Sequence, residues 1–235
     1  MYLKELILLF AFAFLPAIIY VIWIRNTERY NRERWKPIIV CFLWGATVAV
    51  VASIILEVIL EISLVTSFYS VNLIGLSTAI LIAPFAEELV KPFALRTKTV
   101  KREIDELEDG LIYGAVAGLG FSATENLFYG YSFLSEGLLV FLVLIIIRSF
   151  GGCLLHASAT ALTGYGYGKA IINKKSIIRV LPFFVLAVII HAFYNFLVSF
   201  EFIGLISGLV MALIFVAISI RLIRNKIRKL DLSNR

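Results

Sequence analysis

The chain has 235 residues, of which 61% are hydrophobic and 16% are charged. Its mean hydropathy of +0.96 is far above that of soluble domains of similar length, so the composition excludes an ordinary soluble enzyme and indicates an integral membrane protein. The net charge of +6 gives no reason to expect a nucleic acid partner, because the basic residues are spread over four connections between apolar segments.

Seven apolar segments follow one another along the chain. A bilayer core about 30 Å thick requires about 20 apolar residues per helix, and each segment comes close to or exceeds that length. The sequence therefore predicts an all-α, polytopic transmembrane helix bundle that forms a single integral membrane domain over residues 1–235. The predicted spans lie near Leu3–Ile24, Ile38–Leu60, Val71–Leu95, Gly110–Gly130, Leu138–Ile172, Val180–Phe200 and Phe202–Leu222.

The first and the fifth of these spans each allow two interpretations. The first resembles a signal peptide, but its apolar run continues to Ile24 and ends in basic residues, which is typical of a stop-transfer segment, so we expect it not to be cleaved. The fifth is too long for one upright helix. We expect it either to tilt strongly or to break at Gly151 and Gly152, which weaken helix propensity.

Lysine and arginine residues predict the orientation of the chain. Nineteen of the 22 basic residues follow the first, third, fifth or last span, whereas the connections at Glu61–Ser70, Tyr131–Gly137 and Ser199–Glu201 contain none. By the positive-inside rule, the basic side is cytoplasmic. We therefore expect a multi-pass protein of the plasma membrane with its N-terminus outside and its C-terminus in the cytoplasm. The mixed run Lys101–Asp109 is most simply a solvated cytoplasmic loop or a helical cap.

Seven charged or histidine residues lie deep inside the predicted spans, whereas Glu57 lies near the outer end of the second span, where it can reach water. A charged side chain at the bilayer centre costs about 3 kcal/mol or more, so such residues must face one another or a polar cavity. They are therefore candidates for a functional site by default. These residues are Glu87, Glu88, Lys91, Glu125, Arg148, His156 and His191.

The spacing of the charged residues indicates which of them meet. Glu87 and Glu88 precede Lys91 by four and three residues, distances at which helical side chains contact each other. Lys91 can therefore neutralise one carboxylate and leave the other available as a general base. Three glutamates against Lys91 and Arg148 leave a charge of about −1 if the histidines are neutral, so a trapped proton or a metal ion must compensate.

The other polar residues also share helix faces. His191 and Asn195 are four residues apart, and Arg148 and His156 are eight apart, so each pair lies on one side of its helix. In the fourth span, every fourth residue of Gly110–Ser122 is small, a stripe that lets helices pack backbone to backbone in lipid. Glu125 stands just beyond this stripe with Asn126 beside it, where only burial in a polar site makes a carboxylate tolerable.

Four segments that contain these polar residues resemble the motifs of the PrsW family of membrane proteases. Their order and spacing agree with the family from about Pro84 to Asn195, whereas the outer spans match only in being hydrophobic. We therefore expect a motif-bearing protease core at about residues 71–200, with flanking spans at about 3–24, 38–60 and 202–222. The matching segments are Ala86–Pro92 (Glu-Glu-x-x-x-Lys), Phe121–Tyr129, Arg148–Gly164 and His191–Asn195.

The resemblance implies a membrane-embedded endopeptidase related to the CAAX prenyl endopeptidases and the bacteriocin-processing membrane proteases. Its substrate would be a transmembrane or membrane-anchored protein, as in the first cut of an anti-sigma factor. Carried over by motif, Glu87 and Glu88 would be the essential carboxylates, and His156 and His191 the essential imidazoles. We expect one glutamate, assisted by His156, to activate water, and His191 and Asn195 to stabilise the oxyanion.

The metal requirement of such a site is open at this stage, because the family has been described both as glutamic proteases and as metalloproteases. Glu88, His156 and His191 would suffice as zinc ligands, yet the chain has no His-Glu-x-x-His helix. We favour a glutamic protease without a cofactor and keep zinc as the alternative.

Two other functions fit the same residues. Buried glutamate, histidine, lysine and arginine also build proton relays, so a proton-coupled transporter or channel is the runner-up. An odd number of spans and the lack of an obvious internal repeat argue against the usual transporter folds. The third hypothesis is a non-catalytic relative that binds a partner helix.

Overall fold

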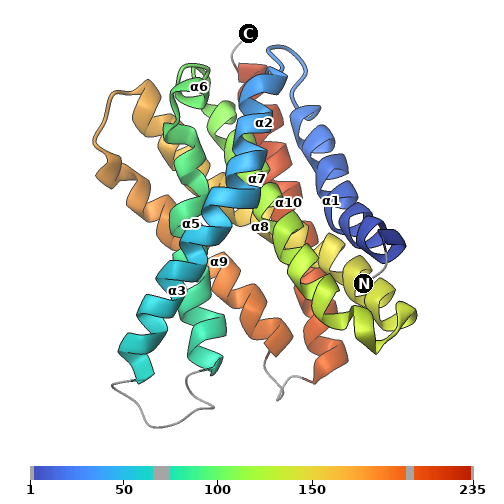
Figure 1. Cartoon of the computed structure of the whole chain (residues 1–235). Helices are drawn as coiled ribbons and strands as arrows, with labels where there is room; N and C mark the ends of the chain where they lie inside the picture. Colours follow the sequence, from blue (N-terminus) through green and yellow to red (C-terminus); the bar gives the residue numbers. More distant parts are fainter. Residues whose placement is uncertain (1–2, 66–74, 200–203, 234–235) are drawn as a thin grey trace.

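The computed structural model describes residues 3–65, 75–199 and 204–233, and these residues form helices and short connections without any strand. The predicted all-α class is therefore confirmed for this part of the chain (Figure 1). The elements are α1 (Leu3–Arg25), α2 (Trp35–Trp44), η1 (Gly45–Ala49), α3 (Val50–Val65), η2 (Thr78–Ile82), α5 (Ala83–Val90), η3 (Lys91–Arg96), α6 (Lys98–Lys101), α7 (Leu107–Phe133), η4 (Leu134–Glu136), α8 (Leu138–Ile172), η5 (Ile177–Val180), α9 (Leu181–Ser199) and α10 (Leu205–Ser233).

Five helices in the described residues are long and apolar enough to cross a membrane. They coincide with the first, second, fifth, sixth and seventh predicted spans, and they make the chain a membrane-embedded helical protein. The predicted total of seven spans and the predicted orientation are not confirmed and stay predictions. The five helices are Leu3–Arg25, Trp35–Ser63, Leu138–Ile172, Ile177–Ser199 and Leu205–Ser233.

The two remaining predicted spans differ from the other five for physical reasons. The third begins at Val71–Ile74, outside the described residues, and continues as the three short elements η2, α5 and η3. The fourth is the continuous 27-residue helix α7. Helix α7 packs against α8, α1 and α2, so protein rather than lipid covers most of it, and its glycine and polar residues are tolerated there.

Glycines bring α7 and α8 into direct backbone contact. A Cβ atom on Gly114 would overlap the carbonyl oxygen of Thr160, and one on Gly118 would overlap that of His156. The contact is reciprocal, because a Cβ on Gly164 of α8 would overlap the backbone of Gly110. The predicted small-residue stripe therefore does pack backbone to backbone, and it fixes the position of α8, which carries His156.

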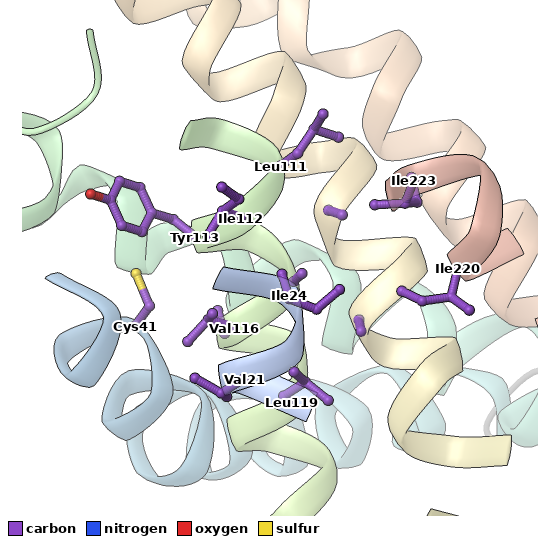
Figure 2. Packing of buried hydrophobic residues seen from close by; sticks show 14 of the residues in the cluster. Val21, Ile24, Cys41, Leu111, Ile112, Tyr113, Val116, Leu119, Ile220 and Ile223 are labelled. Atoms are coloured by element: carbon purple, nitrogen blue, oxygen red, sulfur yellow. The ribbon is translucent and has the colours of Figure 1, made fainter. Parts of the chain in front are cut away.

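The main apolar core lies between α7 and its neighbours. Figure 2 shows side chains of α1 and α2 meeting those of α7, with residues of α10 on the far side of the same cluster. Many large apolar side chains on the outer helices are exposed instead, as lipid-facing residues should be. The labelled core residues are Val21, Ile24, Cys41, Leu111, Ile112, Tyr113, Val116, Leu119, Ile220 and Ile223.

The helix α8 runs without a break through Gly151 and Gly152 for 35 residues, about 53 Å at the usual rise. Of the two interpretations of the fifth span, the structure therefore supports one long helix. The backbone irregularity falls around α5 instead, with the π-helical turn η2 before it and the 3-10 turn η3 after it. Pro84 and Pro92 cause it in part, because neither has an N–H group to continue an α-helical ladder.

An amide side chain repairs the gap that one of these prolines leaves. In the π-helical turn η2, the N–H of Ala83 bonds to the carbonyl of Thr78. The next such bond would join residue 84 to the carbonyl of Ala79, but residue 84 is a proline. The side chain of Asn195 in α9 provides the missing donor, because its Nδ2 donates to the Ala79 carbonyl at 2.8 Å.

The close packing of α7 on α8 makes a prediction about glycine substitution. We expect Gly114→Ala to lower the free energy of unfolding by about 1–3 kcal/mol, because the added methyl would force two backbones apart. Thermal unfolding of the purified protein in detergent measures this change. Gly75→Ala is the matched control, since a Cβ at Gly75 meets nothing within 4 Å; equal unfolding midpoints for the two variants would contradict the packing argument.

Candidate active site

The structure brings all nine predicted site residues together in one polar cluster. They come from four parts of the chain that are far apart in sequence, and direct hydrogen bonds or ion pairs link eight of them, with Asn195 lining the same cavity. Segment α5–η3 provides Glu87, Glu88 and Lys91; α7 provides Glu125 and Asn126; α8 provides Arg148 and His156; and α9 provides His191 and Asn195.

The fully buried side chain of Lys91 lies at the centre of the cluster. Its Nζ is 2.8 Å from Glu87 Oε2, 2.9 Å from Glu88 Oε1 and 2.8 Å from His156 Nδ1, so each of its three N–H groups has one acceptor. The ammonium also lies 4.2 Å from the centre of the Phe121 ring, within range of a cation–π interaction. The expectation that Lys91 would pair with one carboxylate is wrong, since it donates to both.

The two neighbouring glutamates have different surroundings. Glu88 is fully buried, and both of its oxygens accept hydrogen bonds, Oε1 from Lys91 and from His191 Nδ1 at 3.0 Å, and Oε2 from Thr160 Oγ1 at 2.8 Å. Glu87 lines a cavity, and among the described residues only Lys91 donates a hydrogen bond to it, at Oε2. Glu87 is therefore the carboxylate with an oxygen available to a ligand.

Hydrogen bonding defines the tautomers of the two histidines. Because Lys91 can only donate, Nδ1 of His156 is an acceptor, and Nε2–H of His156 donates to Glu125 Oε2 at 2.8 Å. Nδ1 of His191 donates to Glu88, which leaves Nε2 as an acceptor, 3.9 Å from Glu87 Oε2. A water molecule between these last two atoms could donate to both.

A second ion pair supports the cluster from the side of α7 and α8. Arg148 Nη2 lies 2.9 Å from Glu125 Oε2, and its Nε donates to Asn126 Oδ1 at 3.0 Å. The guanidinium carbon lies 3.7 Å from the centre of the Tyr129 ring. Glu125 therefore joins Arg148 to His156 and holds the imidazole in position.

A cavity of about 530 Å³ opens beside these residues. Glu87, Glu125, His156, His191 and Asn195 line it, whereas Glu88 and Lys91 lie behind its wall. Glu57 and Glu61 of α3 also line it, together with Tyr129 and Tyr194. The cavity offers room for a polypeptide segment next to Glu87.

Sequence reasoning missed some contributors to this site. Thr160 lies one turn beyond His156 on α8, and Phe121 and Tyr129 lie at the two ends of the second motif, so spacing and motif membership were signals for all three. For Glu57, the only signal in the sequence was an acidic residue within an apolar segment. Its contribution to the cavity depends on the path of α3.

The donor atoms for a metal ion are present, but they are engaged with Lys91. Glu87, Glu88, His156 and His191 each offer one ligand atom within 4.8 Å of the others, and such a set suits zinc. Three of these residues already bind the Lys91 ammonium, and Nε2 of His156 carries a proton shared with Glu125. In this arrangement, a metal ion bound through all four residues would compete with Lys91 for three of them.

Comparison with known proteins identifies relatives of this chain. A family model described as PrsW family intramembrane metalloprotease matches residues 33–221. The Protease PrsW of Clostridioides difficile (strain 630) is 30% identical over 125 residues, which cover 53% of this chain and 51% of that protein. The chain thus spans about half the length of this curated relative. No solved structure matches it significantly.

Two threonines of α8 test the hydrogen bonding around Glu88. We expect Thr160→Val to lower the free energy of unfolding by about 1–3 kcal/mol, because it leaves a buried carboxylate oxygen without a donor. Thr163→Val is the matched control on the same helix. Its Oγ1 is buried and has no hydrogen-bond partner among the described residues, so that variant should unfold at the same temperature or a higher one. The opposite order of the two midpoints would contradict the arrangement.

Proposed function

The chain belongs to the PrsW family of intramembrane metalloproteases, whose family model covers most of it, and we propose that it is a membrane-embedded endopeptidase that hydrolyses a peptide bond in a membrane protein. One observation carries the proposal. Glu87 presents a carboxylate to a cavity inside an apolar helix bundle, beside an imidazole acceptor and in contact with a buried ammonium. Such a constellation can activate water for attack on a peptide carbonyl.

In the proposed mechanism, Glu87 is the general base. A water molecule held between Glu87 and Nε2 of His191 gives its proton to Glu87, and its oxygen adds to the carbonyl carbon. The carboxylic acid formed at Glu87 then passes this proton to the leaving nitrogen as the C–N bond breaks. Hydrogen bonding to Lys91 keeps the Glu87 carboxylate in one orientation through both steps.

The other residues hold the groups that react. The second N–H of the Asn195 amide, beyond the one that donates to Ala79, is available to the developing oxyanion. His156 acts through its contacts with Lys91 and Glu125 rather than as the base itself. His191, which we expected to donate to the oxyanion, is better suited to orient the water, because its N–H is engaged with Glu88.

We favour the glutamic mechanism over a zinc mechanism because the Lys91 ammonium already pairs with both Glu87 and Glu88. This ammonium takes three of the four donors that a metal would use. Full activity of metal-free protein would fit this assignment, although the matching family model carries metalloprotease in its description.

The substrate and the topology follow from the same proposal. We propose a transmembrane or membrane-anchored protein as substrate, cut in a first step of regulated proteolysis, as the motif resemblance implies for an anti-sigma-factor-like protein. Helix α7 and the α5–η3 segment would add two spans to the five apolar helices. The N-terminus would then lie outside the plasma membrane and the C-terminus in the cytoplasm. The family membership does not favour a proton-coupled transporter.

Substitution of Glu87 tests its assignment as the general base. We expect Glu87→Gln to reduce cleavage by a factor of about 10²–10⁴ without lowering the unfolding temperature, because glutamine retains an acceptor for Lys91. The assay follows single-pass membrane proteins, tagged at both ends, in liposomes with the purified protein. Glu103→Gln, which changes an acidic residue outside the cavity, should cleave normally. Normal cleavage by Glu87→Gln would rule out this carboxylate as the base.

Metal removal tests the mechanistic class. After exhaustive chelation, with metal content measured alongside, we expect cleavage at the original rate. Lys91→Ala is the informative companion, because removing the ammonium frees the three donors that it occupies. We expect this variant to bind about one zinc ion per chain where the unaltered protein binds none. Loss of activity on chelation with recovery on adding zinc would show instead that the protein is a metalloenzyme.

A further inference from the structure

A second cluster of acidic residues lies at the other end of α7, near the C-terminal end of the chain (Figure 1). Its members come from three segments: the connection between α1 and α2, the first turn of α7, and the last turn of α10. All five side chains are buried, with at most 6% of any residue exposed. The cluster consists of Glu28, Glu33, Glu108, Asp109 and Asp231.

Glu28 is the common member of two groups of ligand atoms. One group is Glu28, Glu33 and Asp109, and the other is Glu28, Glu108 and Asp231; within each group the oxygens lie within 4.8 Å of one another. Glu28 is fully buried, and its Oε1 has no hydrogen-bond partner among the described residues. A buried carboxylate oxygen without a donor is costly, so Glu28 Oε1 is available to a ligand.

The hydrogen bonds that hold the cluster come from neutral donors. Glu28 Oε2 accepts from the Glu33 N–H at 3.0 Å, and the Tyr113 hydroxyl donates to Glu33 Oε2. Backbone N–H groups donate to the two aspartates: those of Asp105 and Glu106 to Asp109, and those of Arg29 and Tyr30 to Asp231. These bonds fix the directions of the oxygens but do not neutralise their charge.

The nearby guanidinium groups point to other acceptors. Nε of Arg25 donates to the backbone carbonyl of Glu33 at 2.7 Å, and Nε of Arg224 donates to Thr27 Oγ1 at 2.9 Å. In the part of the chain that the structure describes, no lysine or arginine forms an ion pair with Glu28, Glu33, Asp109 or Asp231. Burial, without such a partner, raises the pKa of Glu28 to about 8, and burial together with the neighbouring Asp109 carboxylate raises the pKa of Glu33.

We propose that Glu28 and the four surrounding carboxylates bind a hard divalent cation, Ca²⁺ or Mg²⁺. The donor set is made of carboxylate oxygens, which suit these ions rather than zinc or copper. The bound ion would tie the α1–α2 connection and the end of α10 to the start of α7. The site is separate from the cavity of Glu87, because Asp109 and Glu125 lie 16 residues apart on α7, about 24 Å along the helix.

Thermal unfolding of the whole purified protein in a nonionic detergent tests the proposal. After treatment with EDTA and EGTA, we expect added CaCl₂ or MgCl₂ to raise the unfolding midpoint, on the order of 5 °C at saturation. Glu28→Gln should remove this response, because glutamine still accepts from Glu33 N–H but lacks the charge. Glu103→Gln, an acidic side chain outside the cluster, and Glu87→Gln, in the other site, should both keep it.

Direct binding is measured with Tb³⁺ as a probe for the same oxygen ligands. We expect about one Tb³⁺ per chain with emission excited through the aromatic residues, displaced by Ca²⁺, and weakened at least tenfold in Glu28→Gln. Asp231→Asn provides a second variant if Glu28→Gln does not fold. If neither Ca²⁺ nor Mg²⁺ shifts the midpoint of the unaltered protein, or if both variants respond as it does, the cluster holds protons instead and the proposal is wrong.

Discussion

The ammonium of Lys91 is the interaction on which the site depends. It lies fully buried in an apolar bundle, where an unpaired charge would be strongly destabilising, and its three donors meet two carboxylates and one imidazole. Each acceptor comes with requirements of its own. The positions of the Glu87 and Glu88 carboxylates depend on the irregular backbone around α5. The position of the His156 imidazole depends on the glycine contact that holds α8 against α7.

Much of this arrangement could be predicted from the sequence because the membrane makes polar residues conspicuous. Glu87, His156 and His191 stand out in apolar surroundings, and spacing correctly paired Glu87 and Glu88 with Lys91. Simultaneous contact of Lys91 with both carboxylates could not be predicted, because it depends on where α5 changes to the 3-10 turn η3. The different environments of the two glutamates depend on Thr160 and His191, which reach Glu88 from other helices.

Three expectations that were not confirmed, or were confirmed only in part, have separate physical causes. Hydropathy indicates contact with lipid. Helix α7 is covered mainly by other helices, so the hydropathy of its sequence is a poor guide to its position in the bundle. The two glycines of α8 do not break it, because their low propensity is outweighed by packing against neighbouring helices. The run Lys101–Asp109 was expected to be solvated or to cap a helix. Glu106 and Asp109 do form a capping box, but Asp109 is buried.

The two acidic clusters face the same electrostatic problem, because each places buried carboxylates within a few ångströms of one another. At the active site, Lys91 and Arg148 supply two positive charges from the chain itself. A covalently attached cation cannot dissociate, so Glu87 keeps its orientation while a substrate enters and leaves. At the other cluster, the chain supplies hydrogen bonds from neutral groups and leaves Glu28 Oε1 without a donor. Such a site requires positive charge from solution, as a proton or as a metal ion. Five carboxylates from three segments favour the metal ion, because one divalent cation can contact several of them at once.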